Sequence, residues 1–481
     1  MFWRGVLGYL PVNIVQAVAG FGSIVVFTRL LSPADYGAYA LAYSTTALVY
    51  TCLFVWIEAA MARFYAAETA GGRDDLYATL YRAFVVMALA LPVVAGAILL
   101  LLPMAAGLKL AIAAGLVSIV VRSLLKLAQE RRRAAGQVRG YAMFDMAQTG
   151  GGFMLGVLFA AIGWGGAAPL AGAGAASAVC LLFALPSEIA PARRGHFQGD
   201  RLKGYAAYGT PIALSLIMGL ALATTDRFVL AAFTNEATVG AYHAGYSLSN
   251  RTLDVMFLWL GMAGGPACIA ALERGGRAAL ERTAREQASF MLLISLPASA
   301  GLALVAHPLA ELMVGPALRD NAARVTPWIA LSGLFYGLTT HYLNTAFTLA
   351  RRTGRQFLAI AIPAVANLIL TLLLIPRFGL DGAMWATTAS YALGALASIA
   401  LQRNGLFLPI PWTTLLRSGL ATAAMAAAVL ALPSPGGVVE LALKAGVGAL
   451  VYAAVAFLLD AGQARTHSGR LVQTLRTRAA A

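Results

Sequence analysis

Seven charged residues lie within long apolar stretches of this 481-residue sequence, where charge is costly. They are Glu58, Arg122, Asp145, Asp226, Arg227, Arg251 and Asp254. A charge at the centre of a membrane-spanning helix costs about 2.5–3.5 kcal/mol on insertion scales, so it normally faces protein or water. An arginine in such a place can bind an anion, and a carboxylate can bind a proton or a cation. This makes Glu58, Asp145, Asp226 and Asp254 candidates for ion coupling.

Two pairs among the charged residues have a structural interpretation beside the functional one. Arg122 and Lys126 are four residues apart and share one face of a helix. They either reach toward lipid headgroups or form a cationic entrance for an anionic ligand. Arg251 and Asp254 are three residues apart, and an internal ion pair is the expected explanation for them.

Tyrosines recur along one side of two apolar stretches. They are Tyr36, Tyr39, Tyr43 and Tyr50 in the first stretch, with Tyr242 and Tyr246 as counterparts in the second. Such rings commonly form an aromatic belt at the membrane surface or pack the core. The alternative is a cavity wall on which sugars stack, and Tyr39, Tyr43 and Tyr242 are the candidates for it.

We find no sequence motif for catalysis or for a cofactor. A nucleotide-binding loop of the G-x-x-x-x-G-K-[ST] kind is absent, and no catalytic triad or metal-ligand cluster is recognisable. The three cysteines, Cys52, Cys180 and Cys268, lack disulfide or zinc spacing. We therefore predict a protein that is not an enzyme and has no cofactor, and that takes any energy from a proton or sodium gradient or from the gradient of its substrate.

The composition places these residues in a membrane. Hydrophobic residues make up 60% of the chain and charged residues 11%, and the mean hydropathy is +0.76. Soluble domains have about 45–50% apolar and about 25% charged residues, and a helix crosses the bilayer core with about 20 apolar residues. Fourteen stretches qualify, which predicts an all-α polytopic membrane protein. They lie near residues 5–28, 36–62, 83–102, 110–127, 141–162, 167–187, 205–233, 239–264, 288–307, 327–349, 357–375, 382–401, 412–432 and 438–459.

The basic residues predict the orientation of these helices. The formal net charge is +15, with 35 Lys and Arg residues against 20 Asp and Glu residues. If the helices alternate in direction, 26 of the 35 fall on one side, six on the other and three within spans. Because Lys and Arg accumulate in cytoplasmic loops, both termini are predicted to be cytoplasmic. The positive charge therefore needs no nucleic acid to explain it. In the long connection near 265–287, residues 272–285 alternate in charge and predict a helix lying on the cytoplasmic surface.

A short pattern, G-A-Y-x-x-x-Y-S, occurs at Gly37–Ser44 and again 203 residues later at Gly240–Ser247. Six predicted helices separate the copies, so both point the same way, as in parallel repeats. The expected domains are an N-terminal lobe (1–190, helices 1–6), a cytoplasmic linker (191–204), a C-terminal lobe (205–403, helices 7–12), helices 13 and 14 (404–462) and a basic cytoplasmic tail (463–481). A central cavity is expected between two pseudo-symmetric six-helix lobes.

Three stretches, in this order, resemble a known family. Arg29–Gly37 reads R-L-L-S-P-A-D-Y-G, Thr225–Leu230 reads T-D-R-F-V-L and leads into Val239–Tyr242, and Ile375–Ala383 reads I-P-R-F-G-L-D-G-A. They are similar to segments of the Wzx-type polysaccharide-biosynthesis flippases, which belong to the MATE-like multidrug/oligosaccharidyl-lipid/polysaccharide (MOP) superfamily.

The resemblance implies a flippase that moves an undecaprenyl-pyrophosphate-linked oligosaccharide, such as an O-antigen, capsule or exopolysaccharide repeat unit, from the cytoplasmic to the periplasmic leaflet of the bacterial inner membrane. The mechanism would be alternating access, with polysaccharide polymerase or export machinery as further partners. Its anionic diphosphate needs cations, for which the candidates are Arg29, Arg122, Arg227 and Arg251. The alternatives are a drug/cation antiporter of the same superfamily, a membrane glycan polymerase or ligase, and an assembly partner in glycan export.

Overall fold

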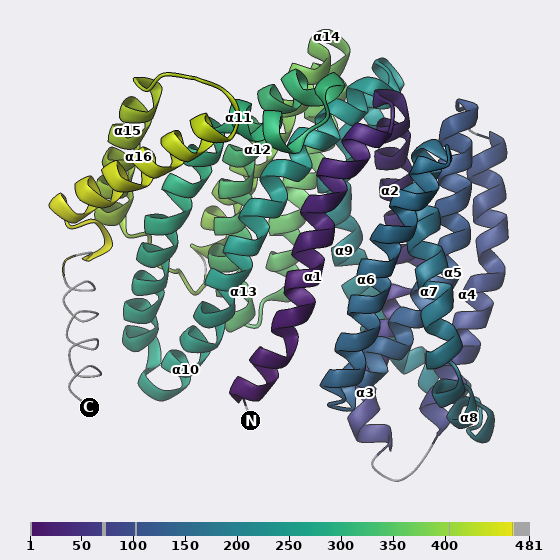
Figure 1. Ribbon diagram of the computed structural model, residues 1–481. Helices are drawn as coiled ribbons and strands as arrows, with labels where there is room; N and C mark the ends of the chain where they lie inside the picture. The colour runs from purple at the N-terminus through teal and green to yellow at the C-terminus, as the bar shows by residue number, and fades with distance from the viewer. Residues whose placement is uncertain (1, 70–73, 102, 404, 464, 466–481) are drawn as a thin grey trace, which may run out of the picture. The chain divides into compact units, whose positions relative to one another are not determined.

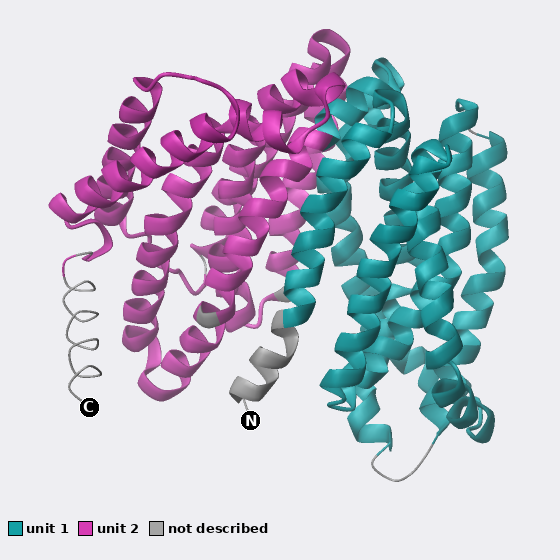
Figure 2. Cartoon of the chain, viewed as in Figure 1, with its two compact units in different colours: residues 1–243 teal, residues 244–481 magenta. Residues whose placement is uncertain are grey.

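The computed structural model describes residues 2–69, 74–101, 103–403, 405–463 and 465, and it is helical almost throughout (Figure 1). Within these ranges no residue is assigned to a strand, which confirms the predicted all-α class. Most of the predicted basic tail, at 464 and 466–481, lies outside the described residues. The chain divides into two compact units, Met1–His243 and Ala244–Ala481 (Figure 2). The division falls inside one long helix, and the lobe boundaries expected from the sequence stay predictions.

Unit 1 contains nine α-helices and the first turns of a tenth in the part of the chain that is described. Their bounds are α1 (Phe2–Leu30), α2 (Pro33–Leu53), α3 (Val55–Thr69), α4 (Asp75–Leu101), α5 (Ala106–Ala134), α6 (Val138–Ala161), η1 (Gly165–Ala167), α7 (Ala168–Ala184), α8 (Pro186–Arg194), α9 (Gly199–Phe233) and the start of α10 (Glu236–Leu304).

Unit 2 contains the remainder of α10 and the helices that follow it. Their bounds are α11 (Ala306–Met313), α12 (Pro316–Leu338), the π-helical segment η2 (Thr339–Leu343), α13 (Thr345–Leu349), α14 (Thr353–Gln402), α15 (Trp412–Leu430), α16 (Gly437–Leu458) and η3 (Ala461–Gln463).

The membrane-spanning segments agree with the fourteen predicted. Among the described residues, nine helices are long and apolar enough to cross a membrane, and α2 with α3 forms a tenth span bent by 48°. Two of the nine, α10 and α14, each contain two spans that meet at a glycine with positive φ, Gly276 (65°) and Gly379 (52°). With α6 and the run α12–η2–α13, these segments account for all fourteen stretches.

The expected surface helix at 272–285 is not a separate element. Both spans of α10 continue as helix through this connection and turn at Gly276. Leu280 and Ala284 are buried and belong to one apolar cluster with Ala288. Their spacing of four residues extends the apolar face of the following span, so this face packs into unit 2 despite the charges beside it.

Local sequence explains the start of α2, which carries the first copy of the repeated pattern. The hydroxyl of Ser32 accepts a hydrogen bond from the Asp35 backbone N–H at 3.1 Å, and Pro33 occupies the first helical turn. Ser is a preferred N-cap residue, and Pro is favoured in the first turn because its missing N–H would have no helical partner.

The two copies of the repeated pattern meet at their glycines, within unit 1. A Cβ built on Gly37 would lie 1.7 Å from the carbonyl oxygen of Glu236, and one built on Gly240 would lie 2.5 Å from that of Pro33. Since Glu236 and Gly240 are each 203 residues after Pro33 and Gly37, the contact is reciprocal, as in a two-fold interface. We call it the glycine crossing; only residues without a side chain allow α2 and α10 to approach so closely.

Candidate functional site

The buried carboxylate of Glu58 lies where α2 bends into α3. The Tyr50 hydroxyl, on the other side of the bend, donates to this carboxylate and lies 2.8 and 2.6 Å from its two oxygens. Phe54, between the helices, has φ −118° and ψ −27°, with φ well away from the usual helical value of about −63°. Neither Pro nor Gly occupies the break, so the tyrosine–carboxylate bond holds two helix segments at a bend that no helix-breaking residue imposes.

Two cations of α5 interact electrostatically with the side chains at this bend. Arg122 interacts electrostatically with the Tyr50 hydroxyl, and Lys126 does so with the Glu58 carboxylate. Lys126 also lies 3.7 Å from Glu130. We call Tyr50, Glu58, Arg122, Lys126 and Glu130 the kink cluster.

Arg122 is the member of the kink cluster whose bonding capacity is not used. It is partly exposed and makes no hydrogen bond or ion pair with any residue that the structure describes. Lys126, in contrast, has Glu130 beside it and lies over the ring of Tyr141, with Nζ 5.8 Å from the ring centroid. Of the two sequence interpretations, the guanidinium of Arg122 suits an anion-binding role, and Lys126 is partly neutralised.

Asp226 and Arg227 are both buried near the end of α9, with exposed fractions of 0% and 4%. The Tyr242 hydroxyl donates to the Asp226 carboxylate, and one guanidinium nitrogen of Arg227 donates to the Ala223 carbonyl at 2.9 Å. Tyr242 itself is fully buried. The bond between Asp226 and Tyr242 joins α9 to the start of α10, whereas the bond of Arg227 lies within α9. Direct contact of any of these three side chains with a ligand stays a prediction.

Arg251 and Asp254 interact electrostatically, but no ion pair within 4 Å joins them in the described part of unit 2. Both side chains are exposed, and Asp254 accepts a hydrogen bond from Asn250 instead. Asn250 lies one helical turn before Asp254, so it reaches the carboxylate without the entropy loss of ordering the long arginine side chain.

The remaining candidates lie at separate places in unit 1. Arg29 is exposed and donates to the Val25 carbonyl at 2.8 Å. Asp145 is buried and accepts a hydrogen bond from Gln16 at 2.8 Å, which joins α6 to α1.

The tyrosines of α2 form a ladder of ring contacts. The Tyr39 ring lies 6.2 Å from that of Tyr43 and 6.0 Å from that of His243. Tyr43 is 45% exposed, whereas Tyr36 is buried. The ladder therefore presents its open face at Tyr43, where a flat ligand could stack.

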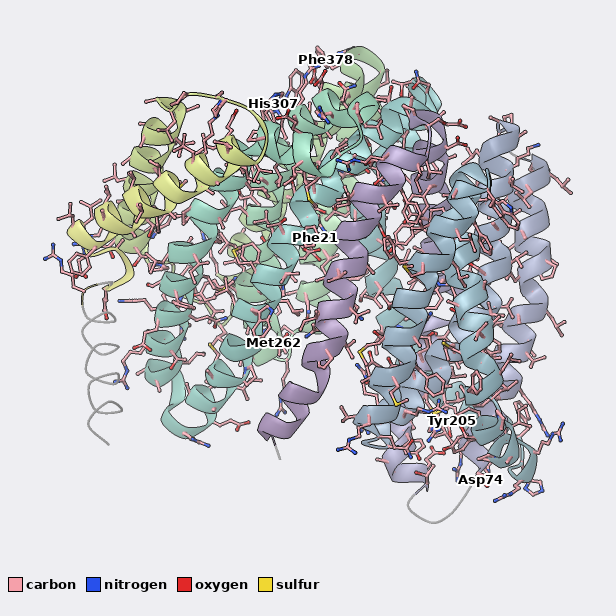
Figure 3. The ribbon with its side chains drawn as sticks, viewed as in Figure 1. Phe21, Asp74, Tyr205, Met262, His307 and Phe378 are labelled. Carbon is pink, nitrogen blue, oxygen red and sulfur yellow. The ribbon has the colours of Figure 1, made fainter. Side chains whose placement is uncertain are left out.

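Sequence reasoning missed the most connected charge in unit 1. Glu188, in the short helix α8, is fully buried and is bound by Arg131 and Arg132 of α5 and by the hydroxyl of Tyr81 in α4. Glu188 directly follows the predicted span 167–187, and nothing in its sequence neighbourhood indicates burial. A second tyrosine in unit 1 also binds a carboxylate. The Tyr205 hydroxyl donates to Glu68, and Tyr205 lies at the same end of unit 1 as Asp74 (Figure 3).

We expect Glu188→Ala to destabilise the protein strongly. Removing one partner of a buried ion pair leaves unpaired charges and typically costs about 3–5 kcal/mol. Thermal unfolding of the purified protein in detergent measures the effect, with exposed Glu273→Ala as the control. Equal unfolding temperatures for the two variants would show that the Glu188 network contributes no stability.

Uncharged polar groups in unit 2 were also missed, because the sequence search looked for charge. Asn367 of α14 is fully buried, and neither amide atom has a hydrogen-bond partner among the described residues. In the π-helical η2, His341 stacks on Phe257 with ring centroids 6.1 Å apart, and its carbonyl accepts from Gln287 at 3.4 Å. π-helical turns often mark functional sites.

Comparison with known proteins decides the family. Residues 26–321 match the family model described as polysaccharide biosynthesis protein, which is more than half of the chain. The chain belongs to this family. The match covers α2 to α11 and the first turns of α12, and so includes the glycine crossing and the kink cluster. The resemblance seen in the sequence is therefore confirmed, and the protein is a multi-pass membrane protein.

Solved structures show that members of the MOP superfamily have the same fold. The lipid II flippase MurJ in an inward closed conformation matches with a TM-score of 0.77 and 13% identity, over 95% of this chain and 99% of that chain. An inward-facing multidrug resistance MATE family transporter matches with a TM-score of 0.63 and 15% identity, over 81% of this chain and 96% of that chain.

A MOP superfamily transporter from Pyrococcus furiosus, whose binding pocket has reverse polarity, matches with a TM-score of 0.56 and 14% identity, over 83% of this chain and 92% of that chain. No curated protein matches the sequence closely enough to count as a relative.

Proposed function

We propose that this protein is a flippase that moves an undecaprenyl-pyrophosphate-linked oligosaccharide from the cytoplasmic to the periplasmic leaflet of the bacterial inner membrane by alternating access. The observation that carries this proposal is the family match over residues 26–321, because it includes α5 and its arginine Arg122. The lipid II flippase that shares the fold supports a lipid-linked substrate. The proposed orientation rests on the basic residues, whose distribution predicts that both termini are cytoplasmic.

The kink cluster supplies chemistry that suits the headgroup of such a lipid. A diphosphate is doubly anionic, and arginine binds phosphate oxygens with paired, charge-assisted hydrogen bonds. Arg122 has this capacity unused, and Lys126 lies one turn away. Arg29, Arg227 and Arg251 are further cations along the proposed path. The open tyrosine ladder at Tyr43 provides a surface for the sugar.

The proposal is tested by reconstituting the full chain in vesicles with a fluorescent polyprenyl-diphosphate-linked oligosaccharide. A reagent that quenches only outer-leaflet label then measures its transfer between leaflets. We expect faster transfer than in protein-free vesicles, and a phospholipid with the same label serves as the control. Transfer of the glycolipid no faster than in protein-free vesicles would contradict the proposal.

Ion coupling is proposed at Glu58, with Asp145, Asp226 and Asp254 as further carboxylates. Glu58→Gln keeps an acceptor for the Tyr50 hydroxyl but removes the negative charge. We expect this variant to retain downhill transfer and to lose its acceleration by an imposed proton or sodium gradient. Transfer rates with and without each gradient measure the effect, with Glu273→Gln as the exposed control. Full acceleration of Glu58→Gln would place the coupling elsewhere.

A drug/cation antiporter is the second candidate, and the MATE transporters that share the fold favour it. Its substrates are cations, which a path containing Arg122 and Lys126 would repel. Uptake of a cationic dye by the same vesicles separates the two functions. A membrane glycan polymerase or ligase has less support, because MurJ and the MATE proteins are a flippase and transporters. Polysaccharide polymerase and export proteins remain proposed partners of the flippase.

A further inference from the structure

Unit 1 contains an apolar cavity away from the kink cluster. Its volume is about 590 Å³, and its walls come from α2, α4, α5, α9 and the first turn of α10. Leu48, Ile112 and Phe228 are typical of the lining, and the lining residues with polar side chains are Thr45 and Glu236. Pockets that enclose small ligands have volumes of about 300–1,000 Å³, so the size suits a ligand with a long apolar part.

The cavity is open on one side. Its wall residues Ala105 and Ala232 are exposed, whereas Ile112, deeper in the wall, is buried. The opening lies where α4 ends, α5 begins and α9 ends, which the orientation predicted from the basic residues assigns to the periplasmic half of the membrane. In a protein surrounded by bilayer, the chains of membrane lipids are the apolar groups present at the highest concentration.

Glu236 gives the cavity a defined charge. Its side chain is partly exposed and makes no hydrogen bond or ion pair with any described residue. A carboxylate in the first turn of a helix such as α10 is stabilised by the helix dipole. Its oxygens can still accept hydrogen bonds from a ligand. Thr45 is uncharged and donates its hydroxyl to the Leu41 carbonyl within its own helix, so the cavity lining contains no cation to balance Glu236.

We propose that this cavity binds one hydrocarbon chain of an amine-headed phospholipid, whose ammonium group pairs with Glu236. The apolar lining takes the chain and the unpaired carboxylate selects the headgroup. A lipid with a net anionic headgroup is disfavoured, since it has no ammonium group to balance the negative charge of Glu236. For this reason the cavity is distinct from the path of the diphosphate-linked substrate, and the lipid bound here is a component of the surrounding membrane.

The test measures which lipid the full-length protein retains. The protein is reconstituted with equal amounts of phosphatidylethanolamine and phosphatidylglycerol that carry the same chains, re-extracted in mild detergent, and examined by mass spectrometry of the intact complex. We expect one tightly held phosphatidylethanolamine per chain, retained about two- to fivefold over phosphatidylglycerol, the range for a partly exposed ion pair. Equal retention of both lipids, or their displacement by undecaprenyl phosphate, would overturn the proposal.

Variants separate the chain from the headgroup. Glu236→Gln should retain a lipid but lose the preference for phosphatidylethanolamine. The exposed control Glu273→Gln should keep that preference. Ala231→Phe fills the cavity and should lose the lipid, whereas Ala97→Phe, on the exposed face of α4, should keep it. If Ala231→Phe does not elute as a folded protein, Leu48→Trp, which places a larger ring in the same cavity, serves as the second cavity-filling variant. A folded cavity-filled variant that retains the lipid as well as the wild type would overturn the proposal.

Discussion

Gly37→Ala is expected to abolish lipid transfer and to lower the free energy of unfolding by about 3 kcal/mol, the upper end of the usual cost of overpacking. The added methyl group would lie 1.7 Å from the Glu236 carbonyl oxygen. Because the obstacle is backbone, no rotation of a side chain can relieve it. The helices α2 and α10 must separate at the glycine crossing, and the hydrogen bonds around it must shift with them.

The reciprocal contact provides an internal check on this result. Gly240→Ala should have a similar effect, because its methyl group would lie 2.5 Å from the Pro33 carbonyl oxygen. Gly107→Ala is the matched control, since nothing lies within 4 Å of a Cβ at that position of α5. Thermal unfolding and vesicle transfer are measured for all three variants. If Gly37→Ala and Gly107→Ala have the same unfolding temperature and transfer rate, α2 and α10 do not approach each other as closely as described.

Arg122→Ala is expected to reduce transfer of the diphosphate-linked oligosaccharide by about 10–100-fold. A hydrogen bond to a charged group contributes about 1.5–3 kcal/mol, and each 1.4 kcal/mol is a factor of about ten. Stability should change little, because Arg122 has no hydrogen bond or ion pair with the described residues to lose. A fall in transfer without a fall in unfolding temperature would therefore report on the ligand.

Two further variants show what Arg122 contributes. Arg122→Lys keeps the charge but not the planar, paired donors, so a partial defect would indicate guanidinium geometry. Arg193→Ala removes an exposed arginine of α8 and should leave transfer unchanged. A wild-type rate for Arg122→Ala would remove this residue from the proposed path.

Hydropathy and charge predicted the membrane-spanning helices well, because the cost of exposing polar backbone to lipid leaves few alternatives to a helix. The sequence was less informative about how spans connect. The connection between the two spans of α10 was expected to lie on the surface, but its apolar residues Leu280 and Ala284 continue the buried face of the second span. The alternating charges in this connection are typical of a surface helix, so the apolar spacing of Leu280 and Ala284 was not recognised.

The candidate site was only partly predictable. The charge search found Glu58 and Arg122 but not the Tyr50 hydroxyl that holds Glu58 across a bend, because the partner lies eight residues away and no proline marks the break. The search also paired Arg251 with Asp254, although Asn250 is the better placed partner. Short-range alternatives of this kind depend on rotamers, which spacing alone does not specify.

The glycine crossing has a consequence for the history of the chain. If a half-length ancestor was duplicated, the face that carries Gly37 would first have paired with its own copy, and fusion would have joined the two subunits in one polypeptide. The tyrosines beside it have since diverged. Tyr242 is buried against Asp226, whereas the residue corresponding to Asp226 in the first copy is Ser23, and Tyr39 remains partly exposed. Tyr242 thus joins two helices through a carboxylate, whereas Tyr39 packs among the rings of Tyr36, Tyr43 and His243.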